Sequence, residues 1–160
     1  MNFSFFLENE EATKLFAQNL ALALKQGDLV TLQGDLGTGK STIARTIIRT
    51  LSNDNTLDVP SPTFTLAQSY QLSQFEIIHA DLYRLSMEEE IDELGLYEAR
   101  EQSILLVEWP EKGADLLGFV TFAITLQYED FGRRVNLKSE EHSIEYLQKY
   151  FATCTFFNNS

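Results

Sequence analysis

Apolar and polar residues alternate with two different periods along this chain, and the two periods predict strands and helices in turn. Segment 3–7 (FSFFL) is typical of a short strand, and segment 28–33 (DLVTLQ) is typical of a second one. Segment 8–27 has helical spacing, with apolar residues at Ala12, Leu15, Phe16, Leu20, Ala23 and Leu24. The helical spacing returns from Lys40 to about Ser52. The first third of the chain therefore predicts strand, helix, strand and helix.

The middle of the chain predicts strands on either side of an acidic helical region. TFTLAQSYQL (63–72) and FEIIHADLY (75–83) have the composition of two strands paired through a polar connection. Segment 86–101 is acidic and helical in pattern, with an interruption near Gly95. SILLVE (103–108) is a nearly continuous apolar run, which is typical of a strand buried on both faces.

The C-terminal part predicts a hairpin over 119–138 and a closing helix over 140–151. The 160 residues contain no repeat, linker or low-complexity block, so we expect one domain over 1–160. No apolar run approaches the roughly 20 residues that span a bilayer, and the N-terminus lacks the basic start of a secretory signal. A single cysteine, Cys154, excludes an intramolecular disulfide. These features predict a cytoplasmic protein without membrane contacts.

The charge of the chain bears on its partners. The formal net charge is −12, because 24 acidic residues stand against 12 basic ones. Such a charge serves solubility, and it also repels a nucleic-acid backbone over about a Debye length. Dedicated nucleic-acid binders usually carry a basic face. Any contact with DNA or RNA is therefore expected to be local or mediated by another protein.

The stretch GDLGTGKS (34–41) concentrates three of the chain's eight glycines within six positions. It fits the pattern G-x-x-x-x-G-K-S/T, and it lies between a predicted strand and a predicted helix, as the pattern requires. The glycines let backbone N–H groups approach phosphate oxygens, and the helix N-terminus adds a partial positive charge. In this pattern Lys40 reaches the β- and γ-phosphates, and the Ser41 hydroxyl is a ligand of Mg²⁺. The stretch predicts a phosphate-binding loop.

Two carboxylates follow buried strands and are candidates for holding Mg²⁺ or placing a water molecule. They are Glu108 after ILLV and Asp81 after FEIIHA. Aspartate is the usual residue at this place, so Glu108 requires room for a longer arm. His79 is expected either to orient a water or Asp81, or to be a structural histidine. For Trp109, core packing and an exposed contact surface both stay open.

The segment after the phosphate-loop helix is a candidate sensor of the γ-phosphate. It contains a Pro-Ser-Pro loop (60–62), and Thr63 and Thr65 are possible hydroxyl donors, although threonine is equally common in plain strands. No asparagine is followed by lysine, so the usual guanine-reading element N-K-x-D is missing from the sequence. ATP is therefore favoured over GTP.

Four motifs in this order resemble the TsaE (YjeE) family: GDLGTGKS (34–41), SPTFTL (61–66), HADLYR (79–84) and VEWPE (107–111). Members are small bacterial ATPases required for threonylcarbamoyl modification of the adenosine next to the tRNA anticodon. The resemblance covers nearly the whole chain. It implies an α/β fold, a P-loop NTPase-like three-layer sandwich whose mixed sheet has a C-terminal antiparallel portion. It also implies action on the proteins TsaD and TsaB, with tRNA reached only through them.

The resemblance also implies roles for individual residues. The expected ATP-binding residues are Gly34, Asp35, Leu36, Gly37, Thr38, Gly39, Lys40, Ser41, Thr42 and Arg133. Ser41 and Glu108 are expected to hold Mg²⁺, and the expected catalytic residues are Lys40, Asp81 and Glu108. Glutamate at the metal site is a family trait, as is the tryptophan beside it. We expect a Mg²⁺-dependent ATPase that is weak alone and depends on its partners.

Two other classes of function stay open at this point. One is a nucleotide-gated binding module with negligible hydrolysis, since small P-loop proteins often hydrolyse slowly until a partner completes the site. The other is a small-molecule kinase, which needs an acceptor pocket and usually a lid rich in arginine. The segment after the phosphate-loop helix is instead acidic around 86–94, which disfavours the kinase.

Overall fold

The structure, a computed structural model, describes residues 2–87 and 89–139. Its strands are β1 (Asn2–Leu7), β2 (Leu29–Gln33), β3 (Ala67–Gln71), β4 (Glu76–Asp81), β5 (Ser103–Glu108), β6 (Phe122–Glu129) and β7 (Gly132–Ser139). Its α-helices are α1 (Glu10–Ala23), α2 (Lys40–Ser52), α3 (Glu89–Glu93) and α4 (Leu96–Ala99). Three 3₁₀ turns complete the elements: η1 (Arg100–Gln102), η2 (Pro110–Lys112) and η3 (Ala114–Leu117). The helix predicted over 140–151 and Cys154 lie outside the described residues.

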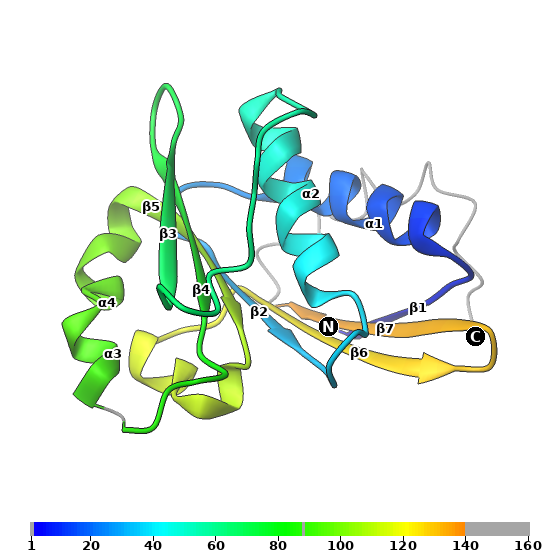
Figure 1. The fold of residues 1–160 in the computed structure, drawn as a ribbon. Coiled ribbons are helices and arrows are strands. Elements are labelled where there is room, and N and C mark those ends of the chain that lie inside the picture. The colour runs from blue at the N-terminus through cyan, green and yellow to red at the C-terminus, as the bar shows by residue number, and fades with distance from the viewer. Residues whose placement is uncertain (1, 88, 140–160) are drawn as a thin grey trace.

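The strands form one mixed sheet in the order β1-β7-β6-β2-β5-β4-β3 (Figure 1). β2 pairs in parallel with both β5 and β6, and β4 pairs in parallel with β5. β7 and β1 extend the sheet antiparallel beyond β6, and β3 closes the other edge antiparallel to β4. The predicted α/β fold with a C-terminal antiparallel portion is confirmed. The place of β1 beside β7 is a long-range pairing that local patterns do not indicate.

Helices cover both faces of the sheet, which gives three layers (Figure 1). Side chains of a strand alternate between its faces, and β5 shows this clearly. Ile104 and Leu106 join the core under α1 and α2, whereas Leu105 and Val107 join the core under α3, α4 and η3. All six residues of β5 are buried, so its continuous apolar pattern follows from contacts on both faces. Among the described residues, no helix is long and apolar enough to cross a membrane.

The first helix is shorter than its apolar pattern indicates. Asn9 caps α1, since its side-chain oxygen accepts a hydrogen bond from the Ala12 N–H at 2.9 Å. The helix ends at Ala23, and Leu24 is already extended. Leu15 was expected in the buried stripe, but it is 40% exposed. It is one residue, or about 100° of helix rotation, away from the buried Phe16.

The strand predicted over 63–72 is confirmed only for Ala67–Gln71. Leu66 has a φ of 65°, in the left-handed region, which interrupts the extended backbone before β3. Its carbonyl oxygen accepts a hydrogen bond from the Asp81 N–H at 2.9 Å, which fixes this turn against the end of β4. The turn carries residues 61–65 to the end of the sheet where β4 stops. The break predicted near Gly95 is confirmed, because Gly95 has a φ of 64° and separates α3 from α4.

The parallel strands end together at one edge of the sheet. Leu32 of β2 and Asp81 of β4 both lie opposite Glu108 of β5 in the strand register. The glycine-rich loop follows β2 directly and leads into α2 at this same edge. The alternation that directs Ile104 and Leu106 toward α2 also directs Glu108 toward α2. The fold therefore gathers the predicted site residues where open α/β sheets bind ligands.

Candidate active site

The loop between β2 and α2 depends on its glycines, as Gly34 and Gly39 show. At Gly34 the φ is 155°, and a Cβ atom would lie 2.6 Å from the Leu126 carbonyl oxygen. Gly39 is the N-cap of α2 with a φ of 111°, and no side chain caps this helix. The first N–H groups of α2 are thus left for a ligand, and an anion is the ligand that a helix N-terminus favours.

Lys40 is buried at the first position of α2, with 4% of the residue exposed. Its Nζ donates hydrogen bonds to the Gly34 carbonyl oxygen at 2.6 Å and to the Asp35 carbonyl oxygen at 2.7 Å. The same Nζ lies 4.4 Å from the ring centroid of Trp109. Burial lowers the pKa of the Lys40 ammonium, and nearby carboxylates, led by Glu108, oppose that shift. The ammonium is held across the glycine-rich loop.

Trp109 forms one wall of the cavity, and it also packs against the core under α3, α4 and η3. It follows β5 with a φ of 55°, a left-handed backbone that turns the chain away from the strand direction. Its ring packs on Tyr83 with a centroid separation of 4.8 Å and also contacts the Lys40 ammonium. A cation over a tryptophan face is an attractive contact, so Trp109 helps to keep Lys40 in place.

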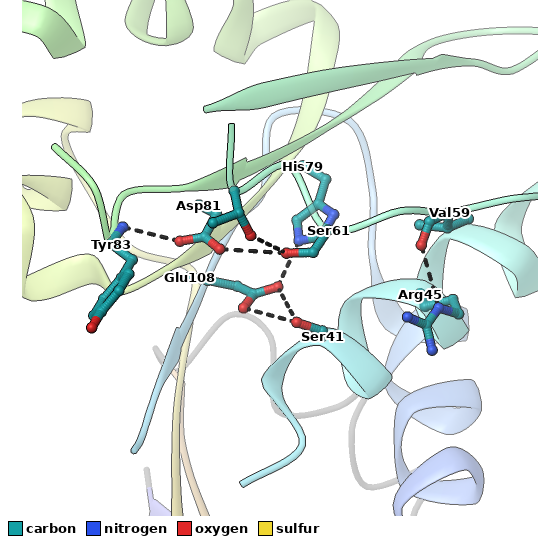
Figure 2. A network of polar contacts seen from close by, with 9 residues as sticks. Ser41, Arg45, Val59, Ser61, His79, Asp81, Tyr83 and Glu108 are labelled. Atoms are coloured by element: carbon teal, nitrogen blue, oxygen red, sulfur yellow. Dashed lines mark hydrogen bonds and ion pairs between the residues drawn. The ribbon is translucent and has the colours of Figure 1, made fainter. Parts of the chain in front are cut away.

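Glu108 is the hub of a buried polar cluster (Figure 2). Its Oε1 and Oε2 accept a hydrogen bond from the Ser41 hydroxyl at 3.1 and 3.2 Å. The Nε2 atom of His79 lies 2.8 Å from Oε1. Three elements, α2, β4 and β5, thus contribute one side chain each to this cluster. Glu108 itself is only 2% exposed.

The oxygens of Ser41 and Glu108 have the spacing of neighbouring ligands around a small cation. With Mg–O bonds of about 2.1 Å at right angles, adjacent ligand oxygens lie about 3 Å apart. The separations here are 3.1 and 3.2 Å. In the part of the chain that the structure describes, no group of three or more His, Cys, Asp or Glu residues is placed to hold a metal. A cation at this point would therefore complete its shell with phosphate and water oxygens, which Mg²⁺ commonly does.

Asp81 is held by a different set of contacts. Its Oδ1 accepts a hydrogen bond from the Tyr83 N–H at 3.0 Å, and its Oδ2 lies 3.5 Å from the Ser61 hydroxyl (Figure 2). Ser61 in turn shares a 2.9 Å hydrogen bond with the Thr63 hydroxyl. Thr65 is exposed and is not part of the cavity wall. Of the two threonines expected as γ-phosphate sensors, only Thr63 is therefore placed beside the site.

These residues surround an open cavity of about 320 Å³. The expected site residues that line it are Leu36, Gly37, Gly39, Lys40, Ser41, Thr42, Asp81, Glu108 and Arg133. Gly34 and Asp35 line an adjoining recess with Trp109. Thr38 is buried, and its hydroxyl donates to the Asp35 carbonyl oxygen at 2.8 Å, so it shapes the loop from within. Ser61 and Tyr83 also line the cavity, and sequence patterns did not single them out.

Arg133 reaches the phosphate-binding loop from β7. Its guanidinium lies 3.6 to 3.7 Å from where a Cβ on Gly39 would stand, so it lies directly beside the start of α2. Nη1 donates a 3.4 Å hydrogen bond to the Thr13 hydroxyl. Within the described residues, the buried Nε of Arg133 has no hydrogen-bond partner. An unsatisfied donor beside the loop is consistent with the expected contact to an anionic ligand.

His79 contacts the Glu108 carboxylate and not the Asp81 carboxylate, which was one of its expected partners. His79 and Asp81 are two residues apart on β4, so their side chains stand side by side on one face and do not converge. Asp81 lies directly opposite Glu108, and the long Glu108 side chain reaches diagonally back to His79. Glutamate, one methylene longer than aspartate, spans this diagonal. The contact between His79 and Glu108 could not be predicted from the order of the strands, because it depends on both the strand register and the length of the glutamate side chain.

Two arginines of α2 attach the loop that carries Ser61. Arg45 Nε donates to the Val59 carbonyl oxygen at 3.3 Å, and Arg49 Nε donates to the Leu57 carbonyl oxygen at 2.9 Å. The spacing of four residues puts both guanidinium groups on one side of the helix. The helix that begins with Lys40 and Ser41 is thereby joined to the loop beside Asp81.

We expect Arg45→Ala to loosen this loop. Loss of one net hydrogen bond of about 1 kcal/mol should raise amide hydrogen exchange over residues 57–63 about fivefold. Hydrogen exchange read by mass spectrometry checks this, with Lys14→Ala on the exposed side of α1 as a control that should leave the loop unchanged. Equal exchange in Arg45→Ala and wild type would show that the loop is held by other contacts.

A family model described as "Threonylcarbamoyl adenosine biosynthesis protein TsaE" matches residues 7–136. The chain belongs to the TsaE family. It is 43% identical over 146 residues to a TsaE protein of Rickettsia felis, covering 89% of this chain and 85% of the relative. It is 36% identical over 126 residues to that of Haemophilus influenzae, covering 78% of each chain. Both relatives are named tRNA threonylcarbamoyladenosine biosynthesis proteins.

A solved structure agrees with this membership. YdiB of Bacillus subtilis superposes with a TM-score of 0.75 and 26% identity, covering 95% of each chain. The predicted resemblance to the TsaE family is thereby confirmed, as is the fold. Membership places the protein in tRNA threonylcarbamoyladenosine biosynthesis, and the TsaE fold indicates a nucleotide-binding protein.

Proposed function

We propose that this TsaE protein is a Mg²⁺-dependent ATPase that acts on the TsaD–TsaB complex and not on tRNA directly. The observation that carries the proposal is the Ser41–Glu108 oxygen pair, 3.1 Å apart, at the mouth of the glycine-rich loop. Hydrolysis of a nucleoside triphosphate requires a phosphate-binding loop and, beside it, a cation site formed by oxygen ligands.

The phosphates would be bound mainly by backbone groups and Lys40. The open N-terminus of α2 offers N–H donors, and Gly34 and Gly39 allow the phosphate oxygens to come close. Lys40 would exchange its contacts with the Gly34 and Asp35 carbonyl oxygens for phosphate oxygens, which attract the ammonium more strongly because they are charged. Arg133, which lies over Gly39, would add a second positive charge.

Ser41 and Glu108 would hold Mg²⁺, which supplies neutralisation of the charge that develops on the phosphate oxygens. Asp81 is the better candidate for placing the attacking water, because Glu108 is already engaged by Ser41 and His79. Within residues 2–87 and 89–139, the Oδ2 of Asp81 has only the long 3.5 Å contact to Ser61, so it can accept a hydrogen bond from water. The water oxygen bonds to the γ-phosphorus while the bond to the β–γ bridging oxygen breaks, which yields ADP, inorganic phosphate and a proton.

The partner assignment rests on the TsaE family and on charge. A chain with a net charge of −12 is repelled by the phosphate backbone of tRNA. We therefore expect it to act through other proteins and not by binding tRNA directly. Contacts with TsaD–TsaB would complete the part of the site around Asp81 that positions the attacking water. The long Ser61–Asp81 distance of 3.5 Å is then expected in the free protein.

Phosphate release from ATP during a titration with purified TsaD–TsaB tests the proposal. We expect the rate to rise and saturate with the partner complex, and Glu108→Ala to abolish the rise. A flat rate, together with ATP-dependent binding to TsaD–TsaB, would instead establish a nucleotide-gated binding module. Phosphate transfer that requires an added small-molecule acceptor would establish a kinase.

A further inference from the structure

His79 occupies a position that packing alone does not explain. It is 1% exposed, in the middle of β4, where it pairs with the buried Leu106 of β5. Its Nδ1 is buried without a hydrogen-bond partner in the described part of the chain. A buried imidazole with one unpaired nitrogen is less favourable than an apolar side chain of similar size. The residue is therefore better explained by what its other nitrogen contacts.

The other nitrogen, Nε2, lies 2.8 Å from Glu108 Oε1 (Figure 2). A carboxylate that serves as a ligand of Mg²⁺, as proposed for Glu108, only accepts hydrogen bonds, so Nε2 would carry the hydrogen of this contact. Ser41 donates to the same carboxylate from the side of α2. The Glu108 group is thus held between a donor from α2 and a donor from β4.

The long side chain of Glu108 makes this second donor necessary. Glutamate has three side-chain torsions, so without a fixed partner its carboxylate can leave the position beside Ser41. The Ser41 hydroxyl rotates freely and fixes only one side of the group. The imidazole of His79 is almost completely buried, so its position is fixed by packing. It therefore determines the position of Glu108 Oε1. A partner of this kind around a metal ligand typically contributes tenfold or more to metal affinity.

We propose that His79 is a positioning residue, which holds the Glu108 carboxylate beside the Ser41 hydroxyl through its Nε2–H. The inference rests on the proposed role of Glu108 toward Mg²⁺ and deepens it. It accounts for a glutamate at a place where aspartate is usual, because the longer side chain reaches both the histidine and the serine. His79 does not touch the nucleotide and acts only through Glu108.

Two substitutions separate positioning from packing. In His79→Gln the amide nitrogen reaches about where Nε2 stands, so the hydrogen bond to Glu108 is kept. His79→Leu fills the slot but donates no hydrogen bond. We measure how the affinity for a non-hydrolysable ATP analogue depends on the Mg²⁺ concentration, with the full chain and without any turnover. His79→Leu should need about tenfold more Mg²⁺ for the same gain in affinity, and His79→Gln should restore most of the difference.

Thermal unfolding of the same variants controls for a merely structural role. His79→Leu removes an unpaired buried nitrogen but also the hydrogen bond to the buried Glu108 carboxylate, so the Mg²⁺ titrations are made at a temperature at which all three proteins are fully folded. Equal Mg²⁺ dependence in wild type and His79→Leu, or an equal defect in His79→Gln and His79→Leu, would overturn the role of His79 alone. If the ATP affinity of the wild type did not depend on Mg²⁺, the proposed metal site would be wrong, and so would this inference.

Discussion

Replacing Lys40 with alanine is expected to weaken ATP binding about 100-fold. The ammonium stands over the glycine-rich loop, within 2.7 Å of two loop carbonyl oxygens, and α2 fixes its position. Charge-assisted hydrogen bonds to phosphate contribute about 1.5–3 kcal/mol each, and about 2.8 kcal/mol corresponds to 100-fold in affinity. Calorimetric titration of the full chain with ATP in the presence of Mg²⁺ measures the effect.

Lys112→Ala is the matched control for Lys40→Ala. It removes the same charge from the exposed turn η2, outside the wall of the cavity, and should bind ATP like the wild type. Lys40→Ala also removes a buried side chain, so its unfolding temperature must be compared with that of the wild type. A folded Lys40→Ala protein with undiminished affinity would mean that the loop binds phosphate through its backbone alone.

Sequence patterns placed the parts of this site that depend on local structure. The loop 34–41 is recognisable because its glycines, lysine and hydroxyl occupy fixed positions within eight residues, at a single strand-to-helix turn. Glu108 and Asp81 were also found, since the ends of parallel strands meet at one edge of a sheet. These predictions need only the order of elements and the direction of the strands.

The contacts of these residues with one another depended on the exact register and backbone geometry. The contact of His79 with Glu108 follows from a diagonal between two strands, and composition cannot distinguish it from a contact with Asp81. Trp109 faces Lys40 only because its own backbone is left-handed, a conformation rarely adopted by tryptophan. Similarly, the left-handed Leu66 turned a predicted strand into the loop that brings Thr63 to the cavity.

Replacing Glu108 with alanine is expected to lower ATP turnover by at least about 100-fold, while ATP affinity falls only about tenfold in the presence of Mg²⁺ and changes little in its absence. The carboxylate provides one of the two side-chain oxygens proposed for Mg²⁺, and metal stabilisation acts mainly on the charge that develops during the reaction. Steady-state phosphate release in the presence of TsaD–TsaB gives the turnover, and calorimetry gives the affinity. Glu108→Gln, which keeps the shape in this buried position, should show the same loss of turnover.

Two further variants make the result on Glu108 specific. Glu101→Ala removes an exposed carboxylate just before the opposite end of β5 and should hydrolyse ATP like the wild type. Since His79 acts only through Glu108, adding His79→Leu to Glu108→Gln should cause no further loss of turnover, whereas independent residues would show additive losses. Wild-type turnover in Glu108→Ala would transfer the metal role to Asp81, the other carboxylate in the cavity wall. His79 would then hold a carboxylate that takes no part in the reaction.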